Sequence, residues 1–136
     1  MSTPKRKLYF SRFKKHVADT RKHLQEPDYI QASEKVWGAM SSLVNAMSSN
    51  EVAGVREKKE AFETLFRSLA VKHGNLRGVL KKSSFMGAYE LATKAEGLHI
   101  YFFGGRNYPD YYIKTTIEDC LTVLEEVEKV LAIQAE

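Results

Sequence analysis

The sequence predicts an all-α protein, folded as an antiparallel up-and-down bundle of four to five helices. Apolar residues recur at steps of three and four positions through every long segment, and no segment alternates apolar and polar residues as a strand does. Short stretches containing Pro or Gly separate the segments, which favours helices that return beside their neighbours. The length suits one hydrophobic core, so we expect a single domain over residues 1–136, with residues 1–7 as a flexible basic tail.

The first expected helix, residues 8–24, is basic on most of its surface and apolar along one stripe. The stripe follows steps of three and four and consists of Tyr9, Phe13, Val17, Thr20 and Leu24. A basic amphipathic helix can also lie on a membrane surface. Because the stripe is narrow, we expect it to face the core of the bundle.

A second helix is expected to begin at Asp28. Pro27 ends the preceding helix, and Asp28 with Gln31 three residues later forms a capping box. The apolar stripe of this second helix contains Trp37 and reaches Met47. We expect the indole of Trp37 to lie in the core rather than to stand exposed for stacking on a base.

The third helix is expected over residues 56–73, with Phe62 on its buried face. Gly74 follows it in the position that favours a left-handed helix cap. Asn75 then starts a short helical turn that reaches Lys82. The connection between these two segments is therefore expected to be very short.

The fourth and last helices are marked by their caps. Ser83 or Ser84 is placed to cap the fourth helix, and two adjacent glycines end it. Pro109 and Asp110 suit the first turn of the last helix, because proline lacks the N–H that this turn leaves unpaired and aspartate complements the helix dipole. Cys120 lies in the apolar stripe of this helix, so we expect an inert core thiol.

Composition excludes several classes of protein. No apolar run approaches the roughly 20 residues that cross a bilayer, and the basic start lacks the apolar core of a secretory signal. A lone cysteine excludes an internal disulfide and a cysteine-based zinc cage. The four histidines show no paired-ligand spacing. We therefore expect a cytoplasmic protein without membrane contact, metal or cofactor.

Charge is distributed unevenly along the chain. Between Lys5 and His23 there are eight basic residues and one acid, whereas from Asp110 onward there are seven acids and two lysines. This asymmetry has two interpretations: a face that binds nucleic acid, or two helices that pack with complementary outer faces. Under the first interpretation, the residues expected to contact phosphates are Lys14, Lys15, Arg21 and Lys22.

The best candidate site lies in residues 93–103, where His99 interrupts an apolar helical face. A histidine titrates near neutral pH, so it can take or give a proton in phosphodiester cleavage. Glu96, one turn earlier, could orient the ring. Lys94 lies five positions before His99, about 140° around the helix, so a lone helix would not place the two side chains together. The alternative is a core histidine whose hydrogen bonds are satisfied.

At these residues the chain resembles the HEPN superfamily. Many members carry an arginine, four to six spacers, a histidine and often a tyrosine two positions later. Here Lys94, four spacers, His99 and Tyr101 follow this pattern, with lysine in place of arginine and Ala95 where members frequently have asparagine. Within the superfamily the chain is similar to small archaeal helical proteins of the PaREP type, on residues 31–39 and 97–103 and more loosely from Phe10 to Leu131.

The resemblance implies a HEPN-like bundle that forms a homodimer and acts on RNA or a nucleotide. It implies at most a weak metal-independent endoribonuclease, of a toxin-type or defence module, because lysine offers one compact charge where arginine offers a planar fork. His99 would be the acid/base, Lys94 the phosphate contact and Tyr101 a supporting group. Some members pair with a nucleotidyltransferase-like protein. The alternative is a non-catalytic dimeric helical interaction module.

Overall fold

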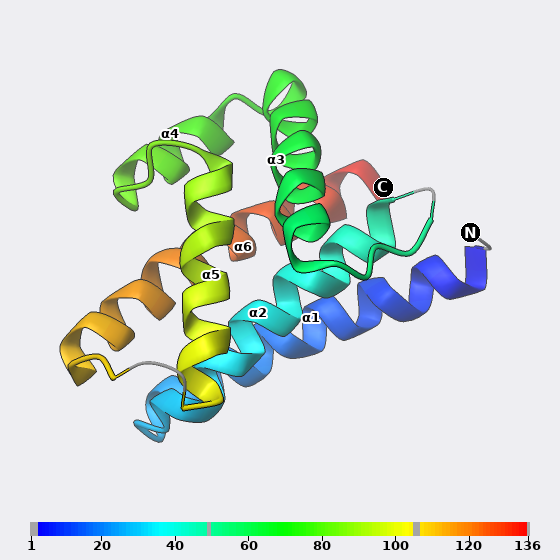
Figure 1. Ribbon diagram of the computed structural model, residues 1–136. Helices are drawn as coiled ribbons and strands as arrows, with labels where there is room; N and C mark the ends of the chain where they lie inside the picture. The colour runs from blue at the N-terminus through cyan, green and yellow to red at the C-terminus, as the bar shows by residue number, and fades with distance from the viewer. Residues whose placement is uncertain (1–2, 49, 105–106, 136) are drawn as a thin grey trace.

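The computed structural model describes residues 3–48, 50–104 and 107–135, and every regular element in these ranges is a helix (Figure 1). The all-α prediction is therefore confirmed for the described part of the chain. The helices are α1 (Thr3–Gln25), α2 (Tyr29–Met47), α3 (Val55–Lys72), α4 (Asn75–Lys82), α5 (Ala88–Phe102) and α6 (Asp110–Ala135).

The helices are arranged around α2. Helix α2 returns alongside α1 as its antiparallel partner, and the contact between these two helices is the most extensive in the structure (Figure 1). Helices α3 and α5 run across this pair rather than along it, and α6 packs against α1, α2, α4 and α5 (Figure 1). The crossing of α3 and α5 over the α1–α2 pair departs from a simple up-and-down bundle.

Residues 1–7 were expected to form a flexible tail, and residues 1–2 of it lie outside the described residues. Residues 3–7 form the first turns of α1. Lys5 Nζ lies 2.5 Å from Glu51 Oε1 in the α2–α3 connection, and this carboxylate raises the pKa of Lys5. A carboxylate distant in sequence thus holds the end of the helix, which local patterns do not reveal.

The helix ends confirm one expected cap and correct two. The amide of Gln31 donates to Asp28 Oδ1 over 3.2 Å, as the capping box predicts. Gly74 is not left-handed: its φ of −59° and ψ of −22° are helical, because α3 passes almost directly into α4. The prediction of a serine cap for α5 is also wrong, because Gly87 occupies the cap position and Ser84 lies in a turn with φ of 66°.

The core runs between all six helices. Trp37 is 5% exposed and Phe62 is 1% exposed, so both lie inside as expected. Cys120 is fully buried, and burial raises the pKa of its thiol to about 12, which confirms an inert core residue. None of the helices, over the residues described, is long and apolar enough to cross a membrane.

Candidate functional site

The imidazole of His99 lies between the C-terminal end of α5 and the first half of α2. His99 Nδ1 is 2.8 Å from Glu34 Oε2. The ring stacks on the indole of Trp37, with centroids 5.3 Å apart and planes inclined by 29°, and meets Phe103 edge-on at 5.0 Å. Glu34 and Trp37 are three residues apart on α2, so they share one face of that helix. One carboxylate and two aromatic rings therefore fix the position of the imidazole.

The contact with Glu34 also determines which ring nitrogen remains available. An ionised carboxylate only accepts hydrogen bonds, so a contact with ionised Glu34 requires the proton on Nδ1 of His99, which then donates to the carboxylate. Nε2 makes no hydrogen bond to another residue of the described ranges, and 27% of the side chain is exposed. A neutral ring in this tautomer presents a lone pair at Nε2, which is the arrangement of a general base.

Glu96, the carboxylate expected to orient His99, is paired elsewhere. Its Oε1 lies 2.8 Å from Lys59 Nζ of α3, and this hydrogen bond is the main cause of the raised pKa of Lys59. Lys59 also lies over the ring of Tyr89, 5.2 Å from its centroid. The expected role of Glu96 is therefore corrected: Glu34 on α2 is the carboxylate that contacts the ring. In the sequence, only the position of Glu34 one helical turn before Trp37 could have pointed to this contact.

Lys94 faces away from His99, as the spacing of five residues predicts. It lines a small cavity of about 160 Å³ between α5 and α6, together with Tyr108 and Tyr112. Tyr101 lies toward the connection that leads into α6, with its ring centroid 6.3 Å from that of Tyr108. Within one chain the structure thus brings Lys94 and Tyr101 to the α6 side of α5, while His99 lies on the α2 side.

Two further basic groups lie close to the α2 residues of this site, and no sequence pattern indicated either of them. Lys58 of α3 lies over the indole of Trp37, 6.0 Å from its centroid, and burial lowers the pKa of its ammonium. His16 of α1 lies so close to α2 that a Cβ at Gly38 would be 3.1 Å from its Nε2. Burial lowers the pKa of His16, while the charge of Glu34 opposes this shift. The site thus draws on α1, α2, α3 and α5.

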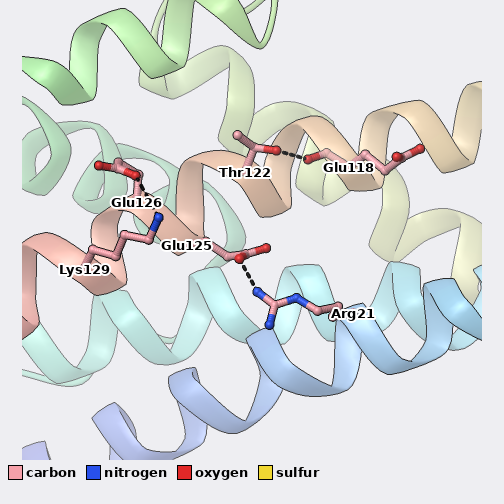
Figure 2. Close-up of polar contacts among 6 residues, drawn as sticks. All are labelled: Arg21, Glu118, Thr122, Glu125, Glu126 and Lys129. Carbon is pink, nitrogen blue, oxygen red and sulfur yellow. Dashed lines mark hydrogen bonds and ion pairs between the residues drawn. The ribbon is translucent and has the colours of Figure 1, made fainter.

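The basic face of α1 is partly neutralised by α6. Arg21 forms an ion pair with Glu125 across the two helices (Figure 2). This pair supports the interpretation of complementary helix faces for Arg21. The other three residues expected to contact phosphates are exposed, and Lys14 lies over the ring of Phe10 at 6.0 Å. These three are Lys14, Lys15 and Lys22.

Comparison with known proteins identifies the family. The model of the archaeal PaREP1/PaREP8 family matches residues 8–131, so the chain belongs to this family. No curated protein and no solved structure matches the chain. The family match covers all six helices in whole or in part, including both halves of the contact between Glu34 and His99.

Proposed function

We propose that this PaREP1/PaREP8 protein is a HEPN-like, RNA-directed protein in which His99, oriented by Glu34, is the acid/base group. The observation that supports the proposal best is the 2.8 Å contact of His99 Nδ1 with Glu34, which leaves Nε2 for a substrate. The resemblance of residues 94–101 to the HEPN motif directs the proposal to RNA. The same resemblance implies a module of the toxin or defence type, and the composition of the chain favours the cytoplasm.

The proposed chemistry is cleavage of a phosphodiester by the neighbouring 2′-hydroxyl of RNA. His99 Nε2 takes the hydroxyl proton, the 2′-oxygen bonds to phosphorus as the P–O5′ bond breaks, and water protonates the departing 5′-oxygen. The imidazolium then returns its proton to the solvent. The products are a 2′,3′-cyclic phosphate and a 5′-hydroxyl end. Glu34 would stabilise the imidazolium that forms, as a buried carboxylate does in hydrolytic triads. This route needs no metal ion.

The phosphate contact has two candidates in the proposed site. Lys94 lies on the α6 side of α5, so it would serve His99 only from a second copy of the chain. Lys58 contacts the indole of Trp37, as the His99 ring does, and is the candidate within one chain for a phosphate that spans this indole. Either lysine supplies one compact charge rather than a bidentate fork, so slow cleavage is expected.

The proposal is tested with single-stranded RNA in the presence of EDTA. We expect slow cleavage that His99→Ala abolishes and Glu34→Gln slows by about tenfold or more, because the ring loses its orienting carboxylate. Glu96→Gln is the matched control, since its carboxylate pairs with Lys59. Cleavage that survives His99→Ala, or that falls equally with both glutamine variants, would contradict the proposed role of His99 and Glu34.

Binding of RNA is proposed to depend on the exposed lysines of α1. The affinity should fall steeply as salt rises, because neutralised phosphates release counterions. Replacing Lys14 and Lys15 by glutamine should weaken binding to all RNA sequences similarly and lower the salt slope by about one per lysine. Lys129→Gln, a change on α6 beside Glu126, is the control. Binding that is insensitive to salt would count against this proposal.

The second candidate function is a non-catalytic dimeric interaction module. It is favoured by the separation of Lys94 from His99 and by aromatic side chains that remain exposed on either side of the α5–α6 connection. Phe103 is 70% exposed and Tyr111 is 76% exposed. In this case sedimentation should show a dimer that Phe103→Ala with Tyr111→Ala dissociates, and no RNA should be cleaved. A nucleotidyltransferase-like protein is the alternative partner for the same surface.

A further inference from the structure

A cavity of about 720 Å³ opens between α3, α4 and the segment that leads from α4 into α5. Its floor is apolar and consists of side chains that are 4–7% exposed. These residues are Phe66, Ala70, Leu80, Phe85 and Ala88. The volume lies within the range of about 300–1,000 Å³ that is usual for small-molecule sites, and such sites combine an apolar lining with few polar groups.

The rim of this cavity is positively charged. Arg77 and Lys81 are four residues apart on α4, so both project from one face of that helix toward the cavity. Neither has an ion pair with any residue that the structure describes. Arg67 also lines the cavity, but Glu63 lies 3.3 Å from it and offsets its charge. The uncompensated charge on the rim therefore comes from Arg77 and Lys81.

An exposed methionine stands beside the apolar floor. Met86 lines the cavity and is 96% exposed, although an apolar side chain of this size is usually covered in part. Its backbone amide donates to Glu90 Oε2 over 3.3 Å. The unbranched thioether chain has three rotatable bonds, so it can turn onto an occupant of the cavity without movement of the helices.

We propose that this cavity binds a small amphipathic anion, with an apolar body on the floor and a carboxylate or phosphate head at Arg77 and Lys81. Charge complementarity selects an anion, and the buried apolar lining selects a ligand with an aliphatic or aromatic body. The cavity includes Ala88 at the start of α5, whereas His99 lies about 16 Å farther along that helix. The proposal therefore goes beyond the RNA-directed function and stands independently of it.

The proposal is tested by NMR titration of the full chain with octanoate and octyl phosphate, with octylammonium as the control of opposite charge. We expect an anion to shift the amide signals of Leu80, Phe85 and Ala88 at millimolar concentration. Octylammonium should bind at least about tenfold more weakly, because charge-assisted hydrogen bonds at the rim are lost. The stronger of the two anions identifies the head group as carboxylate or phosphate.

Paired variants separate the cavity from general surface charge. Arg77→Gln with Lys81→Gln should weaken anion binding by about tenfold or more, whereas Lys72→Gln with Lys82→Gln should leave it unchanged within about twofold. The control pair removes the same charge from exposed positions outside the cavity. Met86→Ser changes a side chain that lies in solvent, so the fold should persist while affinity falls severalfold.

Four outcomes would overturn the proposal. The first is that octanoate and octyl phosphate shift none of the three amides at millimolar concentration. The second is that octylammonium binds as tightly as the anions, and the third is that both charge-removing pairs weaken binding equally. The fourth is that the largest shifts occur at Phe10 and Met47, which line a different groove between α1 and α2.

Discussion

The two sides of helix α5 differ in how their polar groups are used. On the side toward α2 and α3, Glu96 is paired with Lys59 and His99 with Glu34, and the imidazole is stacked on a buried indole. On the side toward α6, Lys94 lines a small cavity among tyrosines, and it has no ion pair with a residue in the described ranges. A spacing of five residues is enough to place Lys94 and His99 in these different surroundings.

The comparison shows that a short sequence motif does not define a site by itself. His99 and Lys94 are close in sequence, but the hydrogen-bond partner of His99 comes from another helix, 65 positions away. On the α2 side, several contacts hold the His99 ring while its Nε2 makes no hydrogen bond to another residue in the described part of the chain. Perturbing each side separately should therefore give unequal effects on stability.

The largest effect is expected from Trp37→Ala. The indole is 5% exposed and supports the His99 ring, so its removal leaves a large cavity and should lower the free energy of unfolding by about 3–5 kcal/mol. Tyr112→Ala on the α6 side should cost about 1 kcal/mol or less, because that ring is 37% exposed. Urea denaturation measures both. Equal losses would contradict the difference between the two sides.

A smaller effect is expected from the loss of single cations. Lys59→Met removes the partner of Glu96 at a site where the two side chains are 13% and 27% exposed, and should cost about 1–3 kcal/mol. Lys94→Met should change the free energy of unfolding by no more than about 0.5 kcal/mol. The same denaturation experiment compares the two variants. If Lys94→Met lowered the free energy of unfolding more than Lys59→Met, the contacts on the α6 side would contribute more to stability, contrary to this expectation.

The smallest effect concerns pH and His16, which lies on the other flank of Glu34. Burial lowers the pKa of His16 in the folded state below the ordinary histidine value of 6.5, so the unfolded chain binds this proton more tightly. Stability is therefore fully present above pH 6.5 and is lost as pH falls from there through the folded pKa. His16→Gln should flatten this part of the stability curve. An unchanged slope in the variant would exclude His16 as its source.

Local features were predictable from the sequence, and contacts between helices were not. Periodicity and the capping box of Asp28 predicted the helices, and the 140° separation of Lys94 from His99 follows from helix geometry alone. Glu34 was not assigned to His99, because this contact depends on how α5 crosses α2. The helical form of residues 3–7 was not expected either, and the ion pair of Lys5 with Glu51 again joins residues distant in sequence.

The most direct test of the account is the tautomer of His99, measured by ¹⁵N NMR of the imidazole at about pH 8.5, where an ordinary histidine is neutral. We expect the form protonated at Nδ1 in the unmodified protein and in Glu96→Gln, with an unprotonated Nε2. In Glu34→Ala the preference for this form should be lost, because its hydrogen-bond acceptor is gone. A ring protonated at Nε2 in the unmodified protein, or a tautomer that changes with Glu96 rather than with Glu34, would contradict the account.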